Sequence, residues 1–164
     1  MIKIGLISDT HNYLHPKIFN FFKNCDEIWH AGDIGNIDIT EDLKIFKPLR
    51  AVYGNMDDFD VRHEYPQHQI FQCEDVKVFM THIGGYPNNY YKPAKDIILK
   101  EKPDLFICGH SHILKIIYDK KYNLLHINPG AAGKTGYHKK ITFVRFCIDK
   151  KEIKDLEIME IDRK

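Results

Sequence analysis

Two histidines follow a short apolar run in the second half of the chain. Residues 105–108 read Leu-Phe-Ile-Cys, which is typical of a strand buried on both faces, and Gly109 ends the run. His110 and His112 come next, and in an extended segment residues i and i+2 point the same way. Imidazoles held at the end of a rigid strand are good ligands for a divalent transition metal, whereas in a plain loop they would only be solvated. The rest of the chain decides between these two interpretations.

Polar residues that can bind a metal follow four other predicted strands as well, each directly or after a glycine. In chain order they are Asp9, His11, Asp33, Asn55 and His82, after strands expected over 2–8, 27–30, 49–53 and 76–80. Open α/β proteins place their sites at the carboxyl ends of strands, along one edge of the sheet. We therefore expect these five residues to converge with His110 and His112.

The chemistry of this set predicts a pair of metal ions. Oxygen and nitrogen ligands without thiolates suit Mn, Fe, Zn or Ni better than a structural zinc cage. Seven protein ligands are too many for one catalytic ion that must keep an open position, but they suit two ions that share a carboxylate. Two ions about 3.5–4 Å apart can hold a hydroxide as nucleophile and clamp the oxygens of a phosphoryl group. We expect two divalent transition-metal ions, with manganese preferred and Zn, Fe or Ni as alternatives.

Composition excludes several other classes. The 164 residues predict one domain over 1–164, and the net charge of +1 gives no basic footprint for nucleic acid. No stretch approaches the roughly 18 apolar residues of a membrane helix, and the N-terminus lacks the layout of a secretion signal. The four cysteines form no CxxC pair, which favours a reduced, cytoplasmic protein. A homo-oligomer is compatible with this composition.

Periodicity predicts how the strands and helices alternate. Helices are expected from Pro16, over 37–46 with Thr40 as N-cap, and from Pro93. Residues 59–67 and 86–92 lack a period and are interpreted as loops. The segments 113–118, 123–127, 141–148 and 153–161 are strand-like, as in an antiparallel meander that the small residues 128–133 interrupt.

The ligand motifs, taken together, match one family. They are Asp9-x-His11, Gly32-Asp33, Gly54-Asn55-x-x-Asp58 with the nearer Asp57, Thr81-His82, and Gly109-His110-Ser111-His112. Their order and spacing resemble those of the calcineurin-like metallophosphoesterases, over residues 2 to about 148. The small size and Asn128-Pro129-Gly130 are most similar to the compact bacterial and archaeal phosphodiesterases of that superfamily, whose core the retromer scaffold subunit shares.

The resemblance implies both a fold and a ligand assignment. The fold would be a four-layer αββα sandwich, with two mixed β-sheets face to face and helices outside. One ion would be bound by Asp9, His11, Asp33 and His112, and the other by Asp33, Asn55, His82 and His110. Asp33 would bridge the two ions, and the residues expected to act in catalysis are Asp33, Asn55 and His82.

Two departures from the family pattern bear on function. Met56 stands where many relatives have a histidine that can protonate the leaving group, and Ala131 stands where close relatives have a serine. We therefore expect a dinuclear metal-dependent phosphodiesterase that acts on a small phosphodiester. One alternative is a catalytically inactive interaction scaffold on the same fold, which tends to lose ligands. Another is a phosphomonoesterase or nucleotidase, which Met56 argues against.

The remaining histidines receive structural interpretations. His30 is expected to be packed or hydrogen-bonded beside the site, and His126 to be structural within a strand. The others, His15, His63, His68 and His138, are expected at the surface, with His63 and Arg62 able to line a substrate entrance. Asp57 is expected to orient Asn55 or His82, because metal ligands need supporting partners.

Overall fold

The structure is a computed structural model that describes residues 1–163, and two five-stranded β-sheets lie at its centre. The first has the order β12-β11-β1-β2-β3 and contains β1 (Ile2–Ile7), β2 (Glu27–His30), β3 (Leu49–Ala51), β11 (Lys140–Asp149) and β12 (Glu152–Asp162). The second has the order β4-β5-β8-β10-β9 and contains β4 (His68–Cys73), β5 (Val76–Thr81), β8 (Leu105–Ile107), β9 (Leu114–Asp119) and β10 (Leu124–Pro129). Each sheet is mixed: in the first, the parallel strands β1, β2 and β3 are followed on one side by the antiparallel strands β11 and β12, and in the second, the parallel strands β5, β8 and β10 lie between the antiparallel strands β4 and β9.

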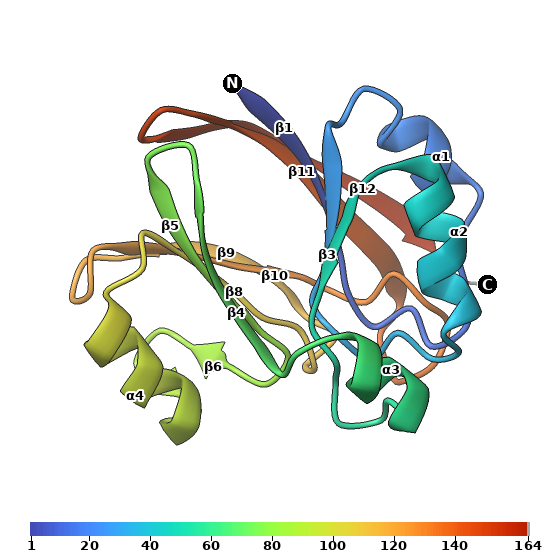
Figure 1. The fold of residues 1–164 in the computed structure, drawn as a ribbon, viewed down its shortest axis with the longest axis horizontal. Coiled ribbons are helices and arrows are strands. Elements are labelled where there is room, and N and C mark those ends of the chain that lie inside the picture. Colours follow the sequence, from blue (N-terminus) through green and yellow to red (C-terminus); the bar gives the residue numbers. More distant parts are fainter. Residues whose placement is uncertain (164) are drawn as a thin grey trace.

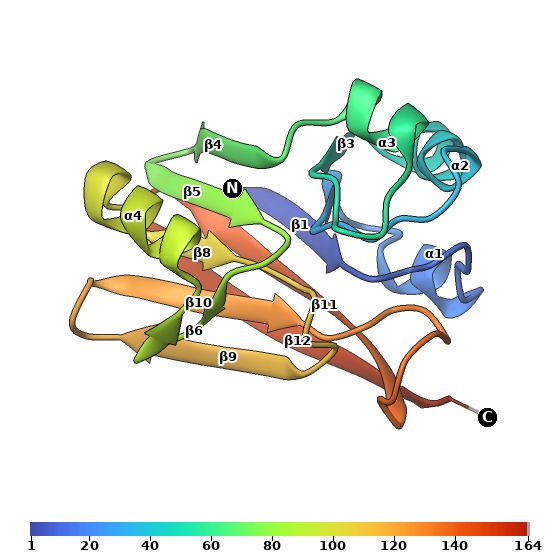
Figure 2. The ribbon, with the colours of Figure 1, turned by 90° about the horizontal axis from the view of Figure 1, so that it is seen from below.

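Helices cover the outer face of each sheet (Figures 1 and 2). The first sheet carries α1 (Lys17–Phe21), α2 (Asp38–Phe46) and α3 (Phe59–Glu64), and the second carries α4 (Lys92–Glu101). The expected four-layer αββα sandwich is therefore confirmed. No helix within residues 1–163 is long and apolar enough to cross a membrane.

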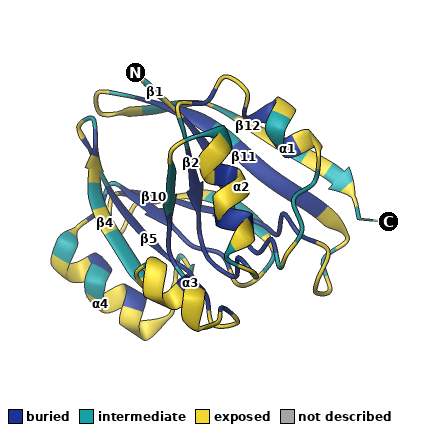
Figure 3. Ribbon diagram, turned by 45° about the vertical axis from the view of Figure 1, so that its right-hand side comes forward, coloured by how far each residue is buried: buried dark blue, intermediate teal, exposed yellow. Residues whose placement is uncertain are grey.

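Alternating side chains of the central strands fill both sides of each sheet. In β1, Ile4 and Leu6 pack between the two sheets, while Ile7 packs against the helices. In β8, Ile107 faces the other sheet and Phe106 lies beneath α4. Burying each large apolar side chain contributes roughly 1.5–3 kcal/mol, so these strands hold the sandwich rigid. Figure 3 shows the result, with buried strands inside and helices exposed on their outer faces.

Two predicted elements were wrong. Residues 59–67 were expected to form a loop, but α3 lies there, and the side chain of Asp58 caps it by accepting a hydrogen bond from the Val61 N–H at 3.2 Å. Thr40 is not an N-cap, because it lies inside α2 and its hydroxyl donates to the Ile37 carbonyl at 2.6 Å. The sequence of this short helix has no clear period, and the capping residue Asp58 is the only local sign of where it begins.

The antiparallel meander predicted for the C-terminal part was also wrong. Strands β9 and β10 form a hairpin in the second sheet, whereas β11 and β12 form a hairpin in the first. The segment 130–139 therefore carries the chain from one sheet to the other. The expected loop 86–92 likewise contains part of a small hairpin of β6 (Gly85–Tyr86) and β7 (Asn89–Tyr90).

Candidate metal centre

The predicted ligands lie together where the parallel strands of both sheets end. Two groups have side-chain donor atoms within 4.8 Å of one another: Asp9, His11 and His112 form the first, and Asp33, His82 and His110 form the second. The first sheet supplies the two carboxylates and His11, and the second supplies the other three histidines. The packing of one sheet on the other is thus what assembles the site.

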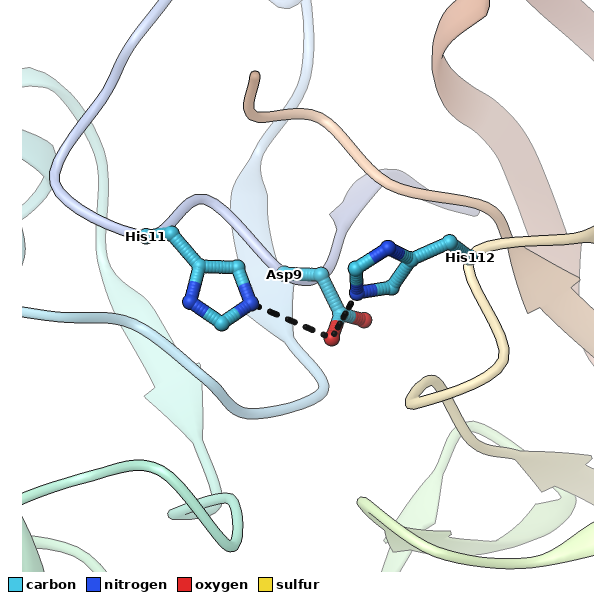
Figure 4. Close-up of side chains that lie close together, drawn as sticks. All are labelled: Asp9, His11 and His112. Carbon is cyan, nitrogen blue, oxygen red and sulfur yellow. Dashed lines mark hydrogen bonds and ion pairs between the residues drawn. The ribbon is translucent and has the colours of Figure 1, made fainter. Parts of the chain in front are cut away.

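Asp9 is held so that one carboxylate oxygen faces the imidazoles of its group. Its Oδ2 accepts hydrogen bonds from the Ser8 hydroxyl at 2.6 Å and from the His110 backbone N–H at 3.1 Å. Its Oδ1 lies 3.1 Å from Nε2 of His112 and 3.8 Å from Nε2 of His11 (Figure 4). The three side chains therefore present their donor atoms to one small volume.

Asp33 belongs to the second group, but one of its carboxylate oxygens also faces a histidine of the first group. Its Oδ1 accepts a hydrogen bond from the backbone N–H of Met56 at 2.8 Å. Its Oδ2 lies 3.1 Å from Nε2 of His82 and 3.6 Å from Nε2 of His11. This oxygen thus faces a histidine of each group, which is the position that a bridging ligand requires.

Asn55 joins the second group through its amide side chain. Its Oδ1 lies 3.0 Å from Nδ1 of His110, and both side chains are exposed at the rim of the site. All seven residues predicted as ligands are therefore brought together at one edge of the sandwich.

His82 shows that the donor set fits a cation. Its Nδ1 lies 2.7 Å from the Ala31 carbonyl, which can only accept a hydrogen bond, so Nδ1 carries the proton. Its buried Nε2 then has a lone pair and no hydrogen-bond partner, yet it lies 3.1 Å from Asp33 Oδ2. Two electron-rich atoms at this distance repel each other unless a positive charge lies between them, either a proton that makes His82 an imidazolium or a metal ion. A divalent metal ion satisfies both atoms at once.

The pKa directions agree with this fit. Burial raises the pKa of the Asp9 carboxyl, but the hydrogen bond to His112 and the charge on His82 lower it more, so the pKa falls below its ordinary value. Burial also raises the pKa of Asp33, and its contacts with His82 again make the net direction downward. For His82, burial lowers the pKa, but Asp33 and Asp9 outweigh it and raise the pKa. The site therefore keeps its carboxylates ionised and favours positive charge between them.

The ligand loops have an unusual backbone conformation. Five of the predicted ligands have positive φ angles: Asp9 (54°), His11 (43°), Asp33 (54°), His110 (71°) and His112 (64°). Such conformations cost on the order of 1–3 kcal/mol for a residue other than glycine. The surrounding hydrogen bonds must therefore hold these loops in place. Gly54 is required for a different reason, since a Cβ atom there would collide with the Asp33 carboxylate.

Asp57 ties two of the ligand loops together. Its Oδ1 accepts the backbone N–H groups of Ile34 at 2.8 Å and Gly35 at 3.0 Å, and its Oδ2 accepts that of Gly54 at 2.7 Å. It thus links the loop after β2 to the loop after β3. Asp57 was predicted to help orient Asn55 or His82, and its bond to the Gly54 N–H holds the backbone next to Asn55, whereas no side-chain bond joins it to Asn55 or His82.

Arg62 on α3 supports the Asn55 loop from the other side. Its Nε donates to the Asp57 carbonyl at 2.7 Å, and one terminal nitrogen donates to the Asn55 carbonyl at 2.9 Å. From the sequence, Arg62 was expected only to line a substrate entrance with His63, because residues 59–67 were interpreted as a loop. The available signal was the capping residue Asp58 with a basic residue one turn later. His63 is exposed, as predicted, and stacks on Phe59, with ring centroids 5.7 Å apart.

Three other histidines were placed with mixed success. His30 is buried and hydrogen-bonded as predicted: its Nε2 lies 3.0 Å from the Thr10 hydroxyl, and its Nδ1 accepts the Gly32 N–H. His68 is half-buried in β4, with Nδ1 2.8 Å from the Thr81 hydroxyl, so the surface prediction was wrong. His138 is also half-buried, and its ring centroid lies 5.0 Å from that of His112. Ala131, in the place of a serine, is fully buried.

Comparison with known proteins finds relatives both in sequence and in fold. The model of the calcineurin-like phosphoesterase superfamily domain matches residues 2–151. A probable metallophosphoesterase from Methanothermobacter thermautotrophicus is 31% identical over 136 residues, which cover 78% of this chain and 76% of that protein. A phosphodiesterase from Methanocaldococcus jannaschii is 25% identical, covering 79% and 83% of the two chains. Among solved structures, a variant of Vps29 from Entamoeba histolytica has a TM-score of 0.78 at 15% identity, covering 98% of this chain and 99% of that one.

Proposed function

The chain belongs to the calcineurin-like phosphoesterase superfamily, and from that premise we propose that it is a dinuclear metal-dependent phosphodiesterase. Family membership gives a metal-dependent hydrolase of phosphate esters. The pair of ions and the preference for diesters are the finer proposal. One observation carries the pair of ions: Asp33 Oδ2 faces a histidine of each ligand group, at 3.1 Å and 3.6 Å.

The residues divide the work as follows. Asp9, His11 and His112 would hold one ion and His82, His110 and Asn55 the other, with Asp33 shared. When bound, such a pair supplies an activated water molecule and neutralises charge on the phosphate oxygens. Asp9 and Asp33 each use their second oxygen to accept hydrogen bonds from the chain, which fixes the direction of the first. His110 and Asn55 lie exposed at the rim, where a phosphate ester approaches from solvent.

Position 56 supports a diester rather than a monoester of a simple alcohol. The Met56 side chain is 70% exposed, and only its backbone N–H takes part in the site, through Asp33. A thioether cannot protonate a departing alkoxide, so the reaction favours leaving groups that depart unaided. The Methanocaldococcus jannaschii relative is named a phosphodiesterase, which supports the same choice over a phosphomonoesterase or nucleotidase.

The scaffold alternative has less support. The likeness to Vps29 concerns the fold alone at 15% identity, so it brings no partner to this chain. A scaffold freed from catalysis needs no ionised carboxylate beside an unpartnered imidazole nitrogen, yet Asp33 and His82 are placed in that way.

The remaining assignments are proposals that rest on composition and ligand chemistry. We propose manganese as the preferred metal, because oxygen and imidazole ligands without thiolate suit it. The four cysteines are all free, which supports a reducing, cytoplasmic setting. The substrate is proposed to be a small phosphodiester rather than a nucleic acid, in line with the net charge of +1, and the chain is proposed to form a homo-oligomer.

Asp33→Asn tests the shared ligand. We expect the variant to lose both ions together and its turnover of bis(p-nitrophenyl) phosphate to fall more than about 100-fold, since loss of even a supporting partner costs about 10–100-fold. Elemental analysis at excess Mn measures the ions, and colorimetry measures turnover. Asp96→Asn on the exposed face of α4 is the matched control. Two ions and near-normal turnover in Asp33→Asn would contradict the bridge.

Met56→His tests the leaving-group argument. A positioned general acid contributes about 10²–10⁴-fold, and the gain is largest for poor leaving groups. Wild-type rates over a series of substituted phenyl diesters should therefore fall steeply as the pKa of the leaving phenol rises. The variant should show a flatter dependence. A shallow dependence in the wild type would mean that another residue already supplies the proton.

A further inference from the structure

The segment between β10 and β11 folds back against the first ligand group. Its Gly133 donates a backbone hydrogen bond to the Asp9 carbonyl at 3.0 Å. His138, five residues later, places its Nε2 2.8 Å from the Gly133 carbonyl. The rings of His138 and His112 lie nearly perpendicular, at 89°, with centroids 5.0 Å apart. His138 is therefore fixed to the same backbone that holds Asp9, directly behind a predicted metal ligand.

The partner of His138 Nε2 determines which nitrogen carries the proton. A carbonyl can only accept, so Nε2 donates to Gly133 and Nδ1 of the neutral ring has a lone pair. This Nδ1 is buried, and no group within residues 1–163 donates to it. An unsatisfied buried acceptor costs about 1–3 kcal/mol, so its position beside the site calls for a role.

His112 requires a hydrogen-bond acceptor at its Nδ1 atom once a metal ion is bound. Its Nε2 faces Asp9 Oδ1 at 3.1 Å and is the atom available to a metal ion. Once that nitrogen binds an ion, the proton must lie on Nδ1, and metal-binding histidines normally donate this N–H to a nearby acceptor. No hydrogen bond to His112 Nδ1 is formed within the described residues 1–163, where only Nε2 of this ring has a partner, and the nearest ring to it is that of His138.

Gly136 shows that the two Nδ1 atoms lie on the same side of this segment. A Cβ atom on Gly136 would overlap His112 Nδ1 and would come within 3.3 Å of His138 Nδ1. Gly136 has a φ of 123°, which glycine adopts freely. The absence of a side chain at Gly136 therefore leaves the space beside both Nδ1 atoms unfilled.

We propose that His138 is a positioning residue for His112, and that its Nδ1 accepts the Nδ1–H of His112 when an ion is bound. This contact fixes the tautomer and the ring orientation of His112, and it makes the imidazole a better ligand. The inference rests on the proposed function only in taking His112 as a metal ligand. It requires no particular substrate.

Zn²⁺ binding to a matched pair of variants tests the contact. His138→Ala removes both ring nitrogens, whereas His138→Asn places an amide oxygen where Nδ1 lies and also lacks Nε2. We expect His138→Ala to bind one of two Zn²⁺ ions about 10–100-fold more weakly by calorimetry, and His138→Asn to restore most of that affinity. Lys139→Ala, at the exposed neighbouring position, is the control. Equal zinc affinities for wild type and His138→Ala would overturn the proposal, as would a loss that asparagine does not restore.

A spectroscopic measurement separates positioning from general structural support. In the zinc-loaded protein, ¹H–¹⁵N spectra should show the His112 Nδ1–H as a slowly exchanging downfield signal, which disappears in His138→Ala and returns in His138→Asn. Its persistence in His138→Ala would overturn the proposal. Diester turnover is not read in these experiments, so a catalytically inactive but zinc-binding protein would contradict the proposed function and leave this inference standing. Wild type that binds no zinc at His112 would overturn both.

Discussion

Two buried histidines of the second sheet lie in opposite surroundings. His82 follows β5 at the sheet edge and is 3% exposed, and His126 lies within β10 and is fully buried. His82 has a carbonyl at one ring nitrogen and a carboxylate 3.1 Å from the other. His126 has no side-chain hydrogen-bond partner at either nitrogen and lies against Phe106 and Tyr90. Burial is therefore the same, but the neighbours differ.

The pKa directions follow the neighbours rather than the burial. Burial lowers the pKa of both rings, but at His82 the two carboxylates reverse the direction and raise it. At His126 nothing comparable opposes burial, and the pKa falls to about 4. The many histidines of the chain thus include two kinds: candidate metal ligands such as His82 and core residues such as His126. A facing carboxylate, which sequence spacing can indicate, is what distinguishes a candidate ligand from a histidine of the core.

Truncation of each ring to alanine tests the difference between His82 and His126 most directly. We expect His82→Ala to weaken metal binding and turnover of a phosphodiester more than about 100-fold, since it removes a ligand and leaves Asp33 facing an empty space. His126→Ala should leave metal binding unchanged and lower the free energy of unfolding, because it opens a cavity. Calorimetry with Mn²⁺ and urea unfolding measure the two effects. Comparable losses of metal affinity in both variants would remove the distinction.

A smaller effect is expected for Asp57, which holds the Asp33 loop and the Asn55 loop together. Asp57→Asn keeps the shape of the side chain but turns one acceptor into a donor, so one of the three N–H bonds to Ile34, Gly35 and Gly54 must break. We expect metal affinity to fall about 10–100-fold. Asp58→Asn is the control, because asparagine caps a helix as well as aspartate does. An Asp57→Asn variant with unchanged affinity would show that the loops keep their shape without this carboxylate.

The fold and the ligands could be predicted because their signals are local. Apolar runs that end in a polar residue identify the parallel strands, and the ends of parallel strands share an edge, which brings Asp9 and Asp33 together on the first sheet; the packing of the second sheet adds His82. The supporting contacts could not be predicted in the same way. Asp57 acts on backbone groups more than twenty residues away in the case of Ile34, and nothing in the spacing of the chain indicates that pairing.

The sheet that each C-terminal strand joins could not be predicted for a similar reason. Strand-like periodicity shows that β9 to β12 exist, but it does not say which sheet each one joins. The change of sheet between β10 and β11 places His138 beside His112, a contact that the predicted meander does not contain. Errors in topology thus became errors in the surroundings of the site.

Burial of His126 should make the stability of the fold depend on pH, without any effect on turnover. Its pKa is about 4 in the folded chain and near 6.5 when unfolded. Between these two values the unfolded chain takes up a proton that the folded chain refuses, so the stability of the fold is complete above about pH 6.5 and falls as the pH drops toward 4. The gap between the two pKa values corresponds to about 3 kcal/mol at the acid end. A backbone hydrogen bond with Phe106 opposes the lowering of the pKa most, Lys115 adds to it and Asp119 opposes it, while the Tyr90 hydroxyl donates to Asp119 at 2.6 Å.

His126→Leu isolates this contribution. Leucine has a similar volume and no nitrogen to leave unsatisfied, so the variant should be as stable as wild type or more so at pH 7.5, by about 1–3 kcal/mol. The advantage should widen at pH 5, because leucine takes up no proton in either state. His30, whose pKa burial lowers to about 3, destabilises both proteins equally in acid and cancels in the difference. Urea unfolding of the metal-free proteins at the two pH values gives this difference directly. If it does not grow on acidification, then His126 finds a partner in solution, and the contrast with His82 is one of degree rather than of kind.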